Sequence, residues 1–178
     1  MKKLLIALAA VIVTVATHAQ GTVVFNNRLS AIGLDAPVTL GSPSGPGAGA
    51  DYSAGLFFNG ALVPGSTTTF RDGSSNPLLA KYINGLTVTI PGTAVDQQNV
   101  TVEMRAWLTS AGSYDAAPAA NRGSSGPLVV AQLGGGANPS TPNNLPASFT
   151  GFVIPVPEPS TIALGVLGAA ALLLRRRK

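Results

Sequence analysis

Short apolar runs, each ended by Gly, Pro, Asn or Ser, constrain the fold of this chain more than any other feature. Between residues 20 and 154 these runs have the length of strands, and none keeps a helical spacing of apolar residues. Glycine and proline weaken helix interiors but suit the turns between strands. We therefore expect an all-β fold. About eight short strands in about 135 residues predict a single β-sandwich with jelly-roll or immunoglobulin-like connections.

The boundaries of the expected strands follow from the apolar runs and the turn residues between them. Strands are predicted at residues 22–25, 37–40, 56–58, 61–63, 67–70, 86–90, 99–109, 128–133 and 147–154. Asn59-Gly60 predicts a two-residue hairpin turn, because both residues accept a positive φ. Segment 99–109 alternates apolar and mixed residues, which is typical of a half-buried strand. Residues 41–51 are rich in Gly and Ser and are expected to form a flexible loop.

The first 19 residues have the layout of a secretory signal peptide. Lys2 and Lys3 precede an apolar core, and small residues lead to an expected cleavage after Ala19. The alternative is a membrane-spanning helix, but the apolar core has about 13 residues where a bilayer crossing needs about 20. We therefore expect Sec export and removal of residues 1–19 by signal peptidase, which leaves a body at residues 20–154.

The last 24 residues, 155–178, divide into three parts. Pro157, Glu158 and Pro159 form an acidic turn, an apolar run follows, and Arg175, Arg176, Arg177 and Lys178 close the chain. As a helix the apolar run would rise about 20 Å, which is less than the roughly 30 Å of the hydrocarbon core. The basic residues can extend its reach and favour the cytoplasm, so a single short transmembrane helix is expected, with the body outside the inner membrane.

This order of parts resembles the PEP-CTERM sorting signal of exported bacterial proteins. The resemblance rests on VPEPSTIALGVLGAAALLLRRRK, which has the Pro157-Glu158-Pro159 triplet, the short apolar helix and the terminal basic cluster in the same order. It implies that an exosortase-type membrane peptidase recognises Pro157, Glu158 and Pro159 and cuts near them. It further implies transient anchoring in the inner membrane, followed by release of the body to the cell surface or extracellular matrix.

The distribution of charge excludes nucleic-acid binding. The chain has a formal net charge of +4, but the surplus lies at its ends. Residues 20–156 hold five basic and six acidic residues, so their net charge is 5 − 6 = −1. A body without a basic patch cannot neutralise several phosphates. The chain also lacks cysteine, and its single histidine, His18, lies in the signal peptide, so no disulfide, no metal site and no cofactor is expected.

The same residues argue against catalysis by the body. A Ser-His-Asp arrangement needs a histidine base, and a glycosidase would need two converging carboxylates. Most acidic residues here lie beside Gly, Pro or Ser, where Asp usually stabilises turns. The six acids of the body are Asp35, Asp51, Asp72, Asp96, Glu103 and Asp115. We expect a non-enzymatic protein, with a β-sandwich carbohydrate-active enzyme as an alternative.

A structural or adhesive role in exopolysaccharide or biofilm is the main functional hypothesis. Aromatic side chains exposed on the body could contact glycans weakly and repeatedly. The candidates are Tyr52, Tyr82, Trp107 and Tyr114. Trp107 lies on the mixed face of segment 99–109, where it either packs at the edge of the core or offers a ligand platform. A further alternative is a periplasmic protein that stays tethered to the inner membrane by an uncut tail.

Overall fold

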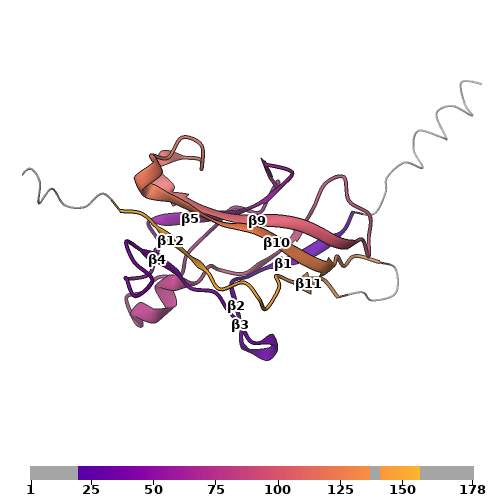
Figure 1. Cartoon of the computed structure of the whole chain (residues 1–178), viewed down its shortest axis with the longest axis horizontal. Coiled ribbons are helices and arrows are strands. Elements are labelled where there is room, and N and C mark those ends of the chain that lie inside the picture. Colours follow the sequence, from indigo (N-terminus) through magenta and orange to yellow (C-terminus); the bar gives the residue numbers. More distant parts are fainter. Residues whose placement is uncertain (1–19, 137–140, 157–178) are drawn as a thin grey trace, which may run out of the picture.

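The computed structural model describes residues 20–136 and 141–156, which form an all-β fold (Figure 1). The strands are β1 Thr22–Phe25, β2 Arg28–Leu29, β3 Leu34–Asp35, β4 Val38–Leu40, β5 Tyr52–Phe58, β6 Ala61–Leu62, β7 Thr68–Thr69, β8 Leu86–Thr89, β9 Gln98–Leu108, β10 Arg122–Gln132, β11 Asn143–Asn144 and β12 Phe152–Ile154. Four short 3-10 helices join them: η1 Ser30–Ile32, η2 Pro77–Lys81, η3 Thr109–Ala111 and η4 Ala119–Asn121. The predicted all-β class is confirmed.

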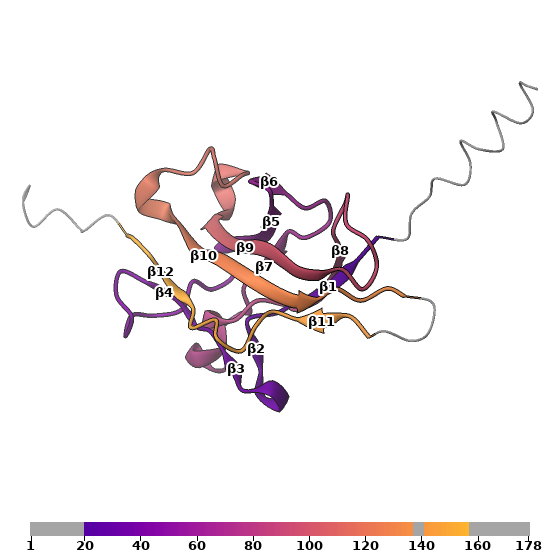
Figure 2. The ribbon, with the colours of Figure 1, turned by 45° about the vertical axis from the view of Figure 1, so that its right-hand side comes forward.

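The largest sheet has the order β10-β9-β5-β6, and β7 also pairs with β5. All of these pairs are antiparallel, and β9 and β10 make the longest ladder. A second sheet has the order β11-β1-β8, and the remaining strands form the pairs β12-β4 and β2-β3. Figure 2 shows β9 and β10 crossing the molecule in front of β1 and β8. Two of the pairs, β1 with β11 and β12 with β4, are parallel.

One hydrophobic core fills the space between the large sheet and the smaller ones. It combines alternate residues of β5, β9 and β10 with residues of β1, β4, β8 and β12. Leu56 and Met104 come from the large sheet, and Val23, Val38 and Ile154 come from the strands facing it; all five are fully buried. Side chains alternate along each strand, so one face of the large sheet supplies this core and the other face is left for a separate cluster. The arrangement fits a β-sandwich, while the jelly-roll and immunoglobulin-like connections stay predictions.

Several strands lie where the sequence predicts them. β1 has the predicted bounds, β9 covers the long alternating segment, and β8 ends before the Pro91-Gly92 turn. The Asn59-Gly60 hairpin is confirmed: Phe58 pairs with Ala61, and Asn59 and Gly60 have φ values of 51° and 81°. Both positive φ values are those that a primed two-residue turn requires. Local sequence is sufficient at these places, because each strand is defined by its own alternation and its own turn.

Other predicted boundaries differ from the structure. β10 begins at Arg122 rather than residue 128, and β12 covers only the last three residues of the predicted strand 147–154. The short strands β2, β3 and β11 were not predicted at all. The loop 41–51 is irregular, but it is packed: a Cβ on Gly47 would lie 2.3 Å from the carbonyl carbon of Ala80. Glycine is required there because two backbone segments meet, which composition alone does not show.

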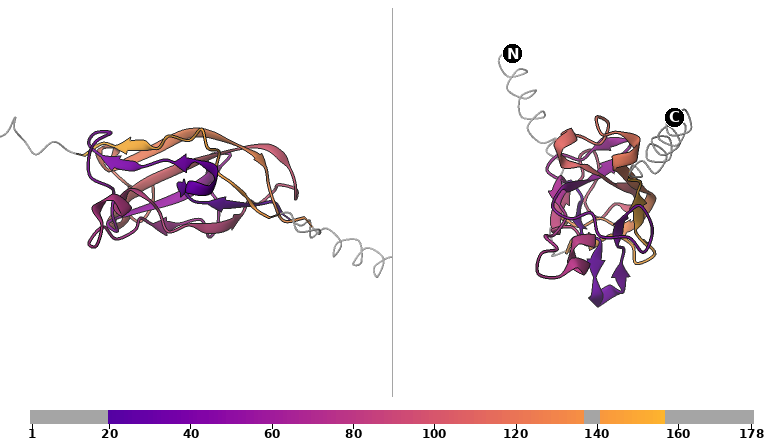
Figure 3. Two further views of the ribbon diagram at one scale, coloured as in Figure 1. Left: turned by 90° about the horizontal axis from the view of Figure 1, so that it is seen from below. Right: turned by 90° about the vertical axis from the view of Figure 1, so that its left-hand side faces the viewer.

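The two ends of the described body lie at opposite ends of its long axis. In Figures 1 and 3 the indigo segment that leads into β1 leaves one end of the molecule, and the yellow segment that follows β12 leaves the other. The predicted signal peptide, the sorting triplet, the short transmembrane helix and the basic stop lie outside the described residues. None of the helices within residues 20–136 and 141–156 has the length and apolar character that a membrane crossing needs.

Candidate functional site

The outer face of the large sheet carries a cluster of aromatic side chains. Phe57 of β5 and Trp107 of β9 meet Tyr114, which lies in the loop between β9 and β10. The ring centroids are 5.8 Å apart for Phe57 and Tyr114, and 6.5 Å apart for each of the other two pairs. All three pairs meet edge to face, which is a favourable geometry for aromatic rings. The loop therefore covers this part of the sheet.

Gly55 of β5 makes room for this cluster. It pairs with Arg105 in the sheet, next to Trp107. A Cβ on Gly55 would lie 2.6 Å from a methyl carbon of Leu62 and 3.1 Å from the indole ring of Trp107. The absence of a side chain at Gly55 thus lets the tryptophan lie flat against the strand. β5 is consequently buried on both faces, as its burial pattern shows.

Arg105 stacks on this aromatic cluster. Its guanidinium carbon lies 4.4 Å from the ring centroid of Phe57 and 5.0 Å from that of Tyr114. Arg105 also donates from Nε and Nη2 to Oε2 of Glu103, at 2.9 and 2.7 Å. From the far side of the loop, Arg122 donates to the backbone carbonyl of Tyr114 at 3.0 Å. The two arginines hold the loop against the sheet by charge, stacking and hydrogen bonds.

The pair Glu103–Arg105 sets the charge of this surface. Burial alone would raise the pKa of Glu103, but hydrogen bonds from Arg105 and Ser124, together with the positive charge of Arg105, lower it. The hydrogen bonds to Glu103 raise the pKa of Arg105. Both groups are therefore ionised at neutral pH and neutralise each other. The carboxylate of Glu103 can accept hydrogen bonds, but it is poorly suited to act as a general acid.

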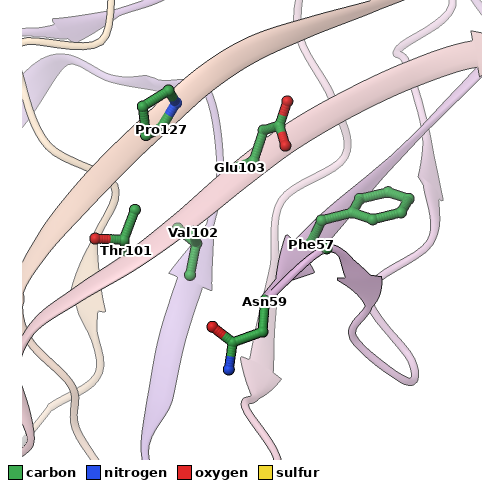
Figure 4. Close-up of a pocket in the computed structure, with 7 residues that line it drawn as sticks. Phe57, Asn59, Thr101, Val102, Glu103 and Pro127 are labelled. Carbon is green, nitrogen blue, oxygen red and sulfur yellow. The ribbon is translucent and has the colours of Figure 1, made fainter.

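A small pocket of about 270 Å³ lies beside this pair (Figure 4). Its lining consists of Phe57, Asn59, Gly60, Thr101, Val102, Glu103 and Pro127. Figure 4 shows Glu103 between Phe57 and Pro127, in agreement with the register of the three strands. Pro127 reaches this place because β10 has a bulge between Ser124 and Pro127. Polar groups of Asn59, Thr101 and Glu103 therefore line this pocket together with the apolar side chains of Phe57, Val102 and Pro127.

Three of the four aromatic residues predicted for glycan contact are not exposed. Tyr52 and Tyr82 are 6% exposed and Trp107 is 2% exposed, so the predicted exposure of these rings is wrong. Tyr52 points from β5 into the core, and the hydroxyl of Tyr82 donates to Asp35 at 2.6 Å. The alternative that Trp107 packs is confirmed, because the loop after β9 covers it. Tyr114 is partly exposed, and its ring edge belongs to the outer cluster.

Sequence reasoning missed the partners that make this surface. Phe57, Gly55 and Arg122 had no assigned role, although the alternation of segment 99–109 correctly placed Glu103, Arg105 and Trp107 on one face. The missing information is the register that sets Phe57 opposite Glu103 and Arg122 opposite Trp107. No group of three or more His, Cys, Asp or Glu side chains able to hold a metal gathers within the described ranges.

The chain leaves the body through β12, which is held on both sides. β12 pairs in parallel with β4, and Gly41 donates to the carbonyl of Ile154 at 2.9 Å. On the other side, a Cβ on Gly123 of β10 would lie 3.0 Å from the carbonyl oxygen of Val153. Gly151, with φ of 84°, lets the start of β12 approach the carbonyl of Pro37. The fixed part of the body therefore reaches to within a few residues of Pro157.

Comparison with known families identifies the segment that follows β12. Residues 155–178 match the family model described as the PEP-CTERM protein-sorting motif. The chain carries a PEP-CTERM sorting motif. The resemblance seen in the sequence is thus confirmed, and the PEP-CTERM motif implies export and sorting at the membrane by an exosortase. Neither the comparison with curated proteins nor that with solved structures found a match.

Proposed function

We propose that an exosortase cuts this chain near Pro157, Glu158 and Pro159 and releases the body to the cell surface or the extracellular matrix. The observation that carries this proposal is the match of residues 155–178 to the PEP-CTERM motif. An N-terminal signal peptide, cut after Ala19, would start the export. The short apolar segment before the basic cluster Arg175–Lys178 would hold the chain in the inner membrane until the cut.

The body is proposed to be non-enzymatic. The carboxylate that lines the outer-face pocket, that of Glu103, is paired with Arg105 and has a lowered pKa, which is the opposite of what a general acid needs. No histidine follows the signal peptide. Asp35 accepts a hydrogen bond from Tyr82, and Asp72 forms a turn with Ser74, so both carboxylates have a structural use. These features support a binding or structural role.

The body is proposed to be a β-sandwich with a structural or adhesive role. It would contact the polysaccharide of the extracellular matrix or biofilm. The support for this role is the pocket beside Glu103, where the side chains of Asn59 and Thr101 are exposed. Weak single contacts of this kind gain strength when many copies meet one polymer. Tyr114 at the neighbouring cluster is the aromatic residue that remains available from the predicted set.

Intact mass tests the sorting part of the proposal. The protein is isolated from its host in membrane and extracellular fractions and weighed by mass spectrometry. We expect an extracellular species that starts at Gln20 and ends near Pro157. A single membrane species that still carries Arg175–Lys178 would contradict release, and would support the alternative of a periplasmic protein tethered by an uncut tail.

Binding to the host's matrix polysaccharide tests the adhesive part. The measurement is co-sedimentation of the purified protein with the polysaccharide. Thr101→Val is expected to weaken binding several-fold, because it removes a hydroxyl that lines the pocket. Thr87→Val is the matched control, since Thr87 is also an exposed strand threonine but lies on β8 in the other sheet. Equal binding by both variants, or no binding by the wild type, would contradict this role.

A further inference from the structure

The sorting motif begins almost at the surface of the folded body. Ile154, the last residue of β12, is fully buried, and only two residues separate it from Pro157. Three peptide units span at most about 10 Å, even when fully extended. A peptidase that engages Pro157, Glu158 and Pro159 at the membrane thus meets the folded body immediately on the N-terminal side of the motif.

Extended peptides are recognised through their main-chain groups, as when a strand is added to the edge of a sheet. On the edge of β12 that faces β4, these groups are already in use. β12 pairs along its whole length with β4, and the carbonyl of Ile154 accepts a hydrogen bond from Gly41 at 2.9 Å. The opposite side of β12 packs against Gly123 of β10. An added strand could not pair on the edge that β4 occupies, and on the other side Gly123 of β10 lies in its way.

The contacts of β12 can break locally, without unfolding the rest of the body. The strand has three residues, and its parallel partner β4 also has three. It is held by the buried side chain of Ile154, by the partly buried ring of Phe152 and by the hydrogen bond from Gly41. Val156, which follows, is 39% exposed, and one of its methyl carbons would lie 3.1 Å from a Cβ on Gly41. Short terminal segments with few contacts open at a lower cost than the core of a domain.

We propose that β12 is a strap that must leave β4 before exosortase can cut, so that the packing of Ile154 and Gly41 sets the rate of sorting. This inference rests on the proposed cleavage and adds that the opening of β12 controls its rate. A folded body would keep the strap closed most of the time and slow the cut. Cleavage would then occur from the small population in which β12 is open.

The test measures how fast the full chain is converted to the shorter form in the host, by pulse-chase labelling. Ile154→Val removes one buried methylene group from the strap and is expected to speed the cut about five-fold. Ile90→Val is the matched control. Ile90 is equally buried, but its N–H bonds the carbonyl of Gly21, beside β1 at the opposite end of the body. This control lowers stability in the same way and should leave the rate unchanged.

A second variant separates access from stability. A Gly-Ser linker of about six residues, inserted between Val156 and Pro157, moves the motif away from the body and leaves the strap intact. We expect faster cleavage of the linker variant, and no further gain when Ile154→Val is added. Equal rates for the wild type, Ile154→Val and the linker variant would overturn the strap while leaving sorting in place. Absence of cleavage in every variant would instead contradict the proposed function itself.

Discussion

At the scale of single residues, Asn27 joins the neighbouring segment at Ala36 to a segment more than fifty residues away, at Lys81 and Ile83. It is fully buried, and its amide nitrogen donates to the carbonyls of Ala36 and Lys81 at 2.8 and 3.0 Å. Its side-chain oxygen accepts from the N–H of Ile83 at 2.9 Å. The side chain thus satisfies three backbone groups that have no strand partner. A buried amide used in this way specifies which segments meet.

Asn27→Ala is expected to lower the free energy of unfolding by about 2–4 kcal/mol, because it leaves several buried backbone groups without a partner. Asn143→Ala is the control, since Asn143 is exposed and should change stability by less than about 0.5 kcal/mol. The measurement is urea unfolding of residues 20–156, followed by tryptophan fluorescence. Similar midpoints for both variants would show that the buried amide contributes little.

The ion pair of Glu103 and Arg105 predicts a dependence on pH. Burial raises the pKa of Glu103, but hydrogen bonds from Arg105 and Ser124 and the positive charge of Arg105 together outweigh burial and lower the pKa from its ordinary value of 4.5. The stabilisation is therefore present above pH 4.5 and is lost as the pH falls through the lowered value. Because Glu103 is 25% exposed, solvent screens the pair, and we expect about 0.5–1 kcal/mol.

Comparison of the wild type with Glu103→Gln measures this contribution. The wild type should be more stable at pH 7, and the difference should shrink steadily as the pH is lowered below 4.5. Urea unfolding at several pH values gives both free energies. A difference that is the same at pH 7 and at pH 3 would show that the charge of Glu103 does not stabilise the fold.

At the scale of elements, the hairpin of β5 and β6 depends on its two turn residues. Gly60 has a φ of 81°, where a side chain is strained, and Asn59 has a φ of 51°. Gly60→Ala is expected to cost about 1–2 kcal/mol of stability. Asn59→Gly keeps the turn accessible and should change stability by a few tenths of a kcal/mol. Thermal unfolding distinguishes the two, and equal melting temperatures would contradict the assigned turn geometry.

Elements that the sequence predicts well are those that its local pattern defines. β9 alternates over most of its length, and the Asn59-Gly60 pair marks the hairpin of β5 and β6. β10 was predicted too short because Gly123, Ser124 and Ser125 do not look like a strand. Gly123 and Ser124 pair because β9 offers a long partner, and the bulge that begins after Ser124 absorbs the extra residue. Ser125 even replaces a ladder bond by accepting from the N–H of Met104 at 3.0 Å.

The candidate site was only partly accessible from sequence for a related reason. Alternation showed which residues share a face, but not what covers that face. Trp107 is buried by the loop that follows its own strand and by Phe57 of β5, and Tyr82 is covered by the β2–β3 hairpin. The sorting motif, in contrast, was legible because its function resides in a contiguous run of residues. Burial depends on tertiary contacts, whereas a sorting motif is a contiguous run of residues that can be recognised directly in the sequence.

At the scale of the whole molecule, β12 belongs to the body and completes it. A chain comprising residues 20–156 is expected to unfold like the full protein, because residues 157–178 follow the last strand. A chain ending at Gly151 would lose the burial of Ile154 and uncover Val38 on β4, at a cost of at least about 2 kcal/mol. Urea unfolding of the two chains tests this. Equal stability would show that β12 adds nothing to the fold.

The position of β1 and β12 at opposite ends of the body gives the protein a direction. Many copies held in one membrane by their tails would all have the same orientation relative to that membrane. Each would show its surroundings the end where β1 begins, beside the glycines that follow β10, and would turn the end with β4 and β12 toward the lipid. In every copy that is still anchored, the tip where β1 begins would then be the part of the body farthest from the membrane.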